Sequence, residues 1–217
     1  MTAPAFASVV NLVSTGVLAL AFGLVWRQSL PARLSLFAAQ SALVAVLAGW
    51  VALCTGKAEL AVVALAVAAL KAGLIPRILR RVVPARPRPA GPARSPAGLL
   101  LGAAALVFVA YAVLLPVVRE ARLPTAGSLP LALATGLIGL WLCVTARRAL
   151  TQVLGFLVFE NGIFVLALLA TYGLPAIVEA GAFLDLLAAV LILKVVLGDI
   201  HDSFQTTDVA HLRELRG

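Results

Sequence analysis

Long apolar segments separated by short polar connections run through nearly the whole chain. A bilayer hydrocarbon core about 30 Å thick needs roughly 20 apolar residues per helix. Seven windows meet this length: residues 5–26, 34–54, 58–79, 97–118, 129–146, 150–171 and 176–198. They lack the strict alternation of apolar and polar positions that membrane β-strands show. The pattern therefore predicts an all-α integral membrane protein with about seven transmembrane helices, because a helix satisfies its own backbone polar groups.

Composition supports this prediction. Of the 217 residues, 63% are hydrophobic and 12% are charged, and the mean hydropathy is +1.10. A soluble domain is roughly half apolar and about a quarter charged. The first window has no basic residue before Arg27 and no clear cleavage site, so we interpret it as a retained helix rather than a signal peptide.

The basic residues are unevenly divided among the connections, and the formal net charge is +8. Alternate connections and the carboxyl-terminal tail hold most of them: Arg27, Arg33, Arg77, Arg80, Arg81, Arg86, Arg88, Arg94, Arg147, Arg148, Arg213 and Arg216. The other connections hold only Lys57, Arg119 and Arg122, beside the acidic Glu59, Glu120 and Glu179. The positive-inside rule then places the amino terminus outside and the carboxyl terminus in the cytoplasm. Topology accounts for the charge, and we expect no nucleic-acid partner.

A run rich in proline and arginine, RRVVPARPRPAGPARSP, divides the chain. Its composition predicts an extended cytoplasmic linker, because proline interrupts helices. The predicted organisation is an amino-terminal three-helix unit (1–79), this linker (80–96), a connecting helix (97–118), a second three-helix unit (129–198) and a cytoplasmic tail (199–217).

The two three-helix units match each other without gaps at an offset of 120 residues. Gln40-Ser41 falls on Glu160-Asn161, and the identities include Thr15-Gly16 on Thr135-Gly136, Arg27 on Arg147 and Glu59 on Glu179. The match predicts a duplication in parallel orientation, which is known among membrane proteins. Chance similarity in a chain rich in alanine and leucine is the alternative.

Three ionisable residues fall deep inside predicted spans. Glu160 lies roughly 15 Å from the cytoplasmic end of its window, Asp185 roughly 14 Å from the outer end of the last window, and Lys71 about 20 Å from an outer end. A charge at such depth costs at least about 2.5–3.5 kcal/mol on insertion scales. The two carboxyls reach the membrane middle at similar depth. The lysine lies slightly on the cytoplasmic side of the midplane, where it can neutralise one of them.

Two interpretations of this trio remain open. In one, a Lys–carboxylate pair and an acid kept neutral by burial tie the bundle together. In the other, the three groups are stations of a proton path. Asn161 and Gln40 are supporting groups that can hold bridging waters in either case. Lys194, which can snorkel to the cytoplasmic interface, and Glu179 are weaker candidates.

Small residues in the apolar segments are interpreted as packing residues. Gly155 and Gly162 permit close helix approach, and Cys54 and Cys143 have no second cysteine or histidine at ligand spacing. The two histidines lie in the polar tail. We therefore expect no metal site and no redox cofactor on this chain.

The run TARRALTQVLGFLVFENG, followed by one further helix and a tail ending in LRELRG, resembles subunit K of bacterial NADH:quinone oxidoreductase and the related small subunit of multisubunit cation/proton antiporters. Extended by an amino-terminal region, the pattern resembles hydrogenase-4 component E, a membrane subunit found with group 4 nickel–iron hydrogenases and formate hydrogenlyase-like complexes. The match is most specific over 145–217, and the segment ALKAGLIP around Lys71 supports the longer family.

This resemblance implies a non-catalytic, multi-pass subunit of a complex I-like redox complex in the bacterial cytoplasmic membrane, with antiporter-like membrane subunits as partners. Asn161 matches the subunit K asparagine, whereas that family's second-helix glutamate falls at Leu157, which cannot titrate. Glu160 lies about one turn later on the same face, and Asp185 is the nearest acidic counterpart in the last helix.

The resulting hypothesis is that Glu160, Asp185 and Lys71 contribute to proton translocation coupled to electron transfer elsewhere in the complex. A non-conducting anchor for antiporter-like subunits is the alternative from another class. A third possible function is that of an independent small transporter.

Overall fold

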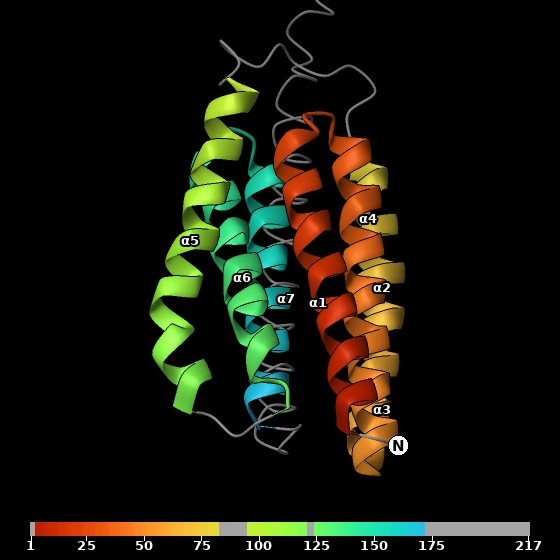
Figure 1. Ribbon diagram of the computed structural model, residues 1–217. Coiled ribbons are helices and arrows are strands. Elements are labelled where there is room, and N and C mark those ends of the chain that lie inside the picture. Colours follow the sequence, from red (N-terminus) through yellow and green to blue (C-terminus); the bar gives the residue numbers. More distant parts are fainter. Residues whose placement is uncertain (1–2, 83–94, 121–123, 172–217) are drawn as a thin grey trace, which may run out of the picture.

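The computed structural model describes residues 3–82, 95–120 and 124–171 of the chain (Figure 1). All regular secondary structure in these ranges is helical, and six segments are long and apolar enough to cross a membrane. The prediction of an all-α protein with several membrane-spanning helices is thus confirmed. The predicted seventh span, 176–198, lies outside the described residues, together with Asp185, Glu179 and Lys194.

The described helices begin and end close to the predicted windows. The third span is built from three consecutive pieces, of which the middle one is a π-helix. In chain order the elements are α1 (Ala3–Trp26), α2 (Leu30–Thr55), α3 (Ala58–Val67), η1 (Ala68–Leu74), α4 (Ile75–Val82), α5 (Pro96–Glu120), the short 3-10 helix η2 (Ala126–Ser128), α6 (Leu129–Thr145) and α7 (Ala149–Thr171). Because α4 continues through Val82, Arg80 and Arg81 lie on a helix and not in the linker where the sequence placed them.

The long helices stand side by side as a bundle (Figure 1). Helix α5 packs against α6 at one edge, and α3 packs against α2 at the other. Contacts of α1 with α6 and of α2 with α7 join the two sides. Two apolar clusters of buried residues fill the interior, one centred on Leu24, Phe37 and Leu154, the other on Val44, Leu60 and Leu168.

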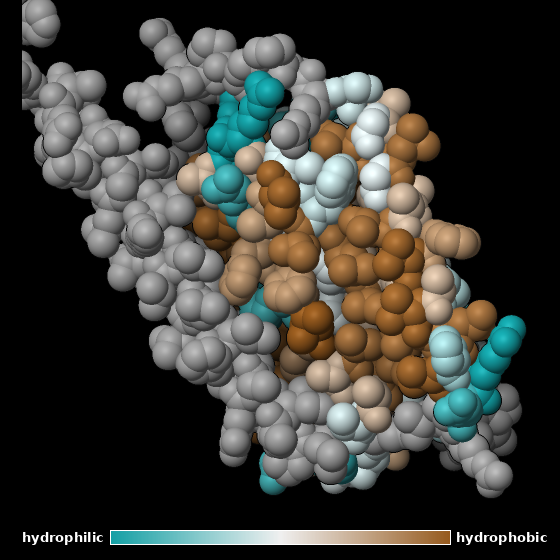
Figure 2. Space-filling model, turned by 90° about the vertical axis from the view of Figure 1, so that its left-hand side faces the viewer, coloured by the Kyte–Doolittle hydropathy of each residue, from teal (hydrophilic) through white to brown (hydrophobic). Residues whose placement is uncertain are grey.

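Much of the outward surface of the bundle is apolar. Figure 2 shows hydrophobic side chains over much of the described surface on the α5 side of the molecule. Leu101, Phe108 and Val113 of α5 point outward with more than half of their surface exposed. A helix that is apolar on its outward as well as its inward face suits a hydrocarbon environment. The fold is that of a multi-pass membrane protein.

Glycines bring α6 and α7 into backbone contact. A Cβ atom added at Gly139, Gly155 or Gly162 would overlap backbone atoms of Phe159, Cys143 or Gly136, respectively. The hydrophobic effect does not drive helices together in lipid, so their association in membranes depends largely on close packing of small residues. The predicted role of Gly155 and Gly162 is confirmed, and Gly139 joins them.

Equivalent positions of the two three-helix units make the same local hydrogen bond. The Thr15 hydroxyl donates to the Asn11 carbonyl over 2.8 Å. The Thr135 hydroxyl donates to the Leu131 carbonyl over 2.9 Å. Both residues of the second bond lie 120 positions after those of the first.

Helix packing follows the same offset. An added Cβ at Gly16 would touch the Leu43 side chain, and one at Gly136 would touch the Ile163 side chain. Leu43 and Ile163 are themselves 120 positions apart, so the two glycines contact equivalent residues of the two units. These matches support the duplication, which stays a prediction because the third helix of the second unit lies outside the described residues.

The predicted orientation can be tested with single cysteines in a variant that lacks Cys54 and Cys143. Gly127, in the α5–α6 connection, and Gln28, in the α1–α2 connection, are both exposed. We expect Gly127→Cys to react with a membrane-impermeant maleimide in intact spheroplasts, and Gln28→Cys to react only after permeabilisation. The reverse pattern would overturn the assigned orientation.

The glycine contacts predict a position-dependent cost of adding one methyl group. Gly162→Ala forces a carbon into the Gly136 backbone, whereas an added Cβ at Gly98 meets nothing within 4 Å. We expect Gly162→Ala to destabilise the chain by about 1–3 kcal/mol, the usual cost of overpacking. Gly98→Ala should not destabilise it. Thermal unfolding in detergent, followed by loss of the monodisperse peak, measures both, and equal midpoints would contradict the packing.

Candidate functional site

Buried polar side chains lie near the middle of five membrane-spanning segments. None of them is more than 2% exposed: Ser14 of α1, Gln40 and Ser41 of α2, Lys71 of η1, Thr135 of α6, and Glu160 and Asn161 of α7. Buried polar groups in an apolar bundle need partners, because hydrocarbon offers none. Their contacts with one another define the candidate site.

An ion pair joins the third span to α7. The Lys71 ammonium nitrogen lies 2.8 Å from Glu160 Oε1, and both side chains are almost completely buried. They are 89 positions apart in the sequence. The pair links the two predicted three-helix units. Removing one member of such a buried pair typically costs about 3–5 kcal/mol, since the other charge is left uncompensated.

Lys71 sits in the middle of the π-helix η1, which runs from Ala68 to Leu74. The Ile75 amide donates to the Leu70 carbonyl, five residues back, in place of the usual four. Pro76 follows one residue later and has no N–H for the Ala72 carbonyl, so the ordinary α-helical ladder cannot continue unchanged here. The wider turn alters the rotation of the helix at this point and thereby helps to aim Lys71. Single π-turns of this kind are frequent at functional sites.

A hydrogen-bonded amide cluster connects α7 to α2 and α1. Asn161 Nδ2 donates to Ser41 Oγ at 3.1 Å and lies 3.5 Å from Gln40 Oε1. Gln40 Nε2 in turn donates to the Val17 carbonyl at 3.0 Å. Asn161 Oδ1 is buried with no donor among the described residues. Such an oxygen can accept a hydrogen bond from water.

The ion pair and the amide cluster meet at consecutive residues of α7. Successive helix positions point about 100° apart, so Glu160 reaches η1 while Asn161 reaches α2. Polar groups therefore follow one another across the bundle, from Lys71 through α7 and α2 to the Val17 carbonyl of α1. These groups can hold charge, protons or water. They include no nucleophile with an activating base.

Arg33 is a buried polar residue whose position the charge pattern did not reveal. It is 9% exposed, and its Nε donates to the carbonyls of Leu24, at 3.0 Å, and Arg27. Its Nη1 lies 3.4 Å from Thr151 Oγ1. Arg33 thus satisfies carbonyls at the end of α1, which have no partner in their own helix, and ties them to α7. The sequence did not place Arg33 inside a helix, because α2 starts at Leu30, four residues before the predicted window.

The structure brings four predicted site residues together: Lys71, Glu160, Asn161 and Gln40. It adds Ser41, which occupies the position aligned with Asn161 at the offset of 120 residues. Asp185, Lys194 and Glu179 cannot be placed, since they lie outside the described residues. In the described ranges, no group of three His, Cys, Asp or Glu residues is placed to hold a metal ion.

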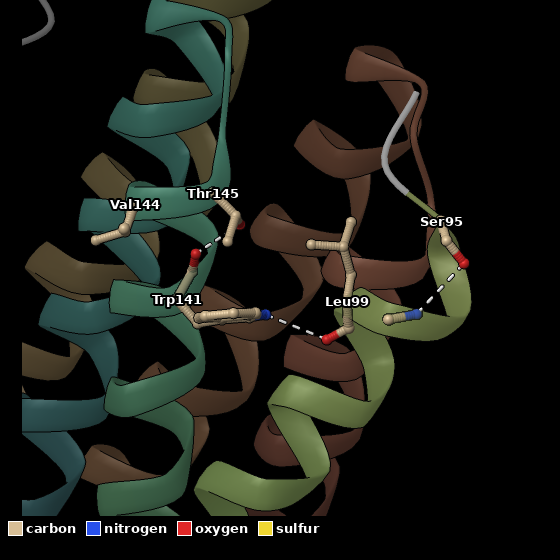
Figure 3. Close-up of a pocket in the computed structure, with 6 residues that line it drawn as sticks. Ser95, Leu99, Trp141, Val144 and Thr145 are labelled. Carbon is tan, nitrogen blue, oxygen red and sulfur yellow. Dashed lines mark hydrogen bonds between the residues drawn. The ribbon is translucent and has the colours of Figure 1, made fainter. Parts of the chain in front are cut away.

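A shallow groove of about 470 Å³ lies elsewhere, between α5 and α6 (Figure 3). Trp141 forms part of its lining, and the Trp141 indole nitrogen donates to the Leu99 carbonyl at 3.2 Å. Gly102 leaves room for the indole ring, which an added Cβ would overlap. The groove is lined by Ser95, Gly98, Leu99, Trp141, Val144 and Thr145. None of these can ionise near neutral pH, so the candidate site remains the buried polar row.

Comparison with known proteins gives one relative that matches along nearly the full length. The chain is 36% identical over 214 residues to the uncharacterized protein Rv0085 of Mycobacterium tuberculosis, and the alignment covers 97% of both chains. The chain belongs to the family of this mycobacterial protein. No protein-family model and no solved structure matches it.

A second group of relatives carries a functional name. Over 133 residues the chain is 32% identical to hydrogenase-4 component E of Escherichia coli K12, and the same values hold for the Shigella flexneri protein. The alignment covers 58% of this chain and 62% of the relative, so the chain spans about three fifths of the length of these relatives. Hydrogenase-4 component E, which the sequence motifs resemble, is thus similar to this chain over part of its length.

The amide cluster predicts an energetic coupling between α2 and α7. Hydrogen bonds between membrane helices average about 0.6 kcal/mol and reach about 1.7 kcal/mol in double-mutant cycles. We expect a coupling in this range for Ser41→Ala with Asn161→Ala, measured by unfolding in mixed detergent micelles. Ser35→Ala, six positions earlier on α2 and exposed, should act independently of Asn161→Ala. Additive effects of Ser41 and Asn161 would show that their contact contributes nothing.

Proposed function

We propose that this chain is a membrane subunit of a hydrogenase-type redox complex, and that Lys71 and Glu160 contribute to proton translocation coupled to electron transfer elsewhere in that complex. The similarity to hydrogenase-4 component E supports the first part. The observation that carries the second is a buried ion pair between two membrane-spanning segments, one in each of the two predicted three-helix units. Intramembrane ionisable groups commonly mark ion or proton pathways.

The pair has the physical properties of a proton-coupled switch. The Lys71 ammonium and the Glu160 carboxylate lie 2.8 Å apart, and opposite charges attract strongly in a medium of low dielectric constant. In the proposed mechanism, movement of Lys71 away from Glu160 weakens this attraction and is the step at which the carboxyl exchanges a proton. A conformational change that shifts η1 would therefore load or unload Glu160, with no covalent chemistry on this chain.

The amide cluster provides polar surroundings beside this switch. Asn161, Gln40 and Ser41 carry no charge at any working pH, but they can orient water molecules between titrating groups. Asp185 remains the first candidate for a further proton station, with Lys194 and Glu179 as weaker ones. A path of this kind needs at least one further station, because one buried pair does not span the membrane.

The proposed setting combines the family resemblance with the distribution of basic residues among the connections. The subunit would lie in the bacterial cytoplasmic membrane with its amino terminus outside, next to antiporter-like subunits, in an assembly related to complex I. It would carry no cofactor of its own, and the resemblance of 145–217 to subunit K belongs to this proposal.

A non-conducting anchor is the competing function. A buried ion pair can exist only to hold helices in register, and such pairs are often replaceable by apolar residues without loss of stability. The neutral double variant Lys71→Met/Glu160→Gln separates the two functions, since it removes both charges of this pair together. An independent small transporter would migrate alone on blue-native electrophoresis, whereas a subunit would co-migrate with large membrane and redox proteins.

Proton translocation in sealed membrane vesicles tests the proposal. Vesicles holding the intact complex are compared for wild type, Glu160→Gln and the double variant, at matched assembly on blue-native gels. We expect both variants to lower pumping at least about tenfold, as removal of a proton-transferring group commonly does. The control is Glu59→Gln, which removes an exposed carboxyl in the first turn of α3 and should leave pumping unchanged.

The double variant decides between the functions. Normal pumping by assembled Lys71→Met/Glu160→Gln would establish the anchor and overturn the proton-path proposal. Asp185→Asn, assayed in the same way, extends the test to the last predicted span.

A further inference from the structure

The outward face of α1 differs from the outward faces of its neighbours. Asn11 and Thr15 are exposed there, one turn apart, with Ser8 and Ala19 exposed on the same side of the helix. Residues at spacings of three and four share one helix face. By contrast, most exposed side chains in the middle of α3 and α5 are apolar: Val62, Leu65, Leu101, Phe108, Val109 and Val113. The exposed Tyr111 phenol of α5 is the exception. An amide and a hydroxyl therefore mark the α1 face.

These polar residues lie within the membrane-spanning part of α1. The apolar span runs from Ala5 to Trp26, so Asn11 is roughly 9 Å and Thr15 about 15 Å from its outer end. The Thr15 hydroxyl donates to the Asn11 backbone carbonyl. The Asn11 side-chain amide has no hydrogen-bond partner among the described residues. Lipid tails cannot supply one, and an amide left unbonded in hydrocarbon is costly.

We propose that the α1 face formed by Ser8, Asn11, Thr15 and Ala19 docks a transmembrane helix of a neighbouring subunit. That helix would place an amide or hydroxyl side chain opposite Asn11 and small residues along the contact. Ser8, Thr15 and Ala19 are small enough to let two backbones approach. The inference rests on the proposed function, because it takes a different subunit of the complex as the partner.

Hydrogen-bonding demand selects this occupant. Asparagine side chains drive helix association in membranes because amide donors and acceptors can satisfy each other across the contact. The exposed valine and leucine side chains of α3 make no such demand and suit lipid, and on α5 only the Tyr111 phenol interrupts the exposed apolar side chains of its middle. A polar face on one helix of the bundle also fixes the direction from which the partner approaches.

Site-specific photo-crosslinking in the native complex tests the contact. A photoreactive residue replaces Leu12, which is 73% exposed and adjacent to Asn11, or Phe108, which is 76% exposed on α5. We expect Leu12 to crosslink a different subunit, with an adduct yield several-fold above that at Phe108. Absence of a protein adduct at Leu12 overturns the proposal. Adducts confined to a second copy of this chain, or to residues 176–198 of the same chain, also overturn it.

Removal of the amide gives an independent measurement. Asn11→Leu should lower the amount of intact complex on blue-native gels at least about threefold while the abundance of the chain in the membrane is unchanged, and Asn11→Gln should restore the complex. The matched control is Gln152→Leu, which removes an exposed amide near the cytoplasmic end of α7 and should have no effect. Unchanged assembly in Asn11→Leu counts against the docking face.

Failure of this inference is distinguishable from failure of the proposed function. If the chain does not co-purify with redox and antiporter-like subunits, the proposed function fails. If it co-purifies but Leu12 forms no adduct with another subunit, the proposed docking face alone is wrong.

Discussion

The ion pair between Lys71 and Glu160 is the constraint on which the rest of this bundle depends. Neither charge is tolerable alone in hydrocarbon, so the third span and α7 must present the two side chains to each other at the same depth. The π-helical turn at Lys71 meets this requirement from one side. The backbone contact between α6 and α7 meets it from the other, because Gly139 packs against Phe159 and Gly162 against Gly136, immediately beside Glu160.

The contacts that hold the site in place are unevenly divided among its helices. α7 is held to α6 through glycines, to α2 through Asn161 and Ser41, and to the end of α1 through Thr151 and Arg33. η1 carries Lys71 in a helical form that is intrinsically less regular, followed by a proline. A proton-coupled rearrangement would thus occur more readily in the third span than in α7. The same division suits a subunit that receives conformational changes from a neighbour.

Much of the candidate site followed from the sequence, since a charged or amide side chain inside a 20-residue apolar window is conspicuous. Lys71, Glu160, Asn161 and Gln40 were found in this way. Their partners were not, because the depth of a residue limits the possible contacts without specifying which helices are neighbours. Arg33 was missed because it lies at the predicted edge of a window, where an arginine fits the topology rule equally well. The π-turn at Lys71 has no local sequence pattern beyond a nearby glycine and proline.

By itself, the sequence determined that the chain crosses a membrane several times as helices, where those helices begin and end to within a few residues, and which polar residues are carried into the hydrocarbon. These features depend on the length and hydropathy of local segments, because the thickness of the bilayer sets how many apolar residues a spanning helix needs. Only the tertiary structure decided that Lys71 pairs with Glu160, that Asn161 pairs with Ser41, and that Asn11 faces outward. Those outcomes depend on which helix faces meet, and in lipid that choice rests on packing and hydrogen bonding between residues far apart in the chain.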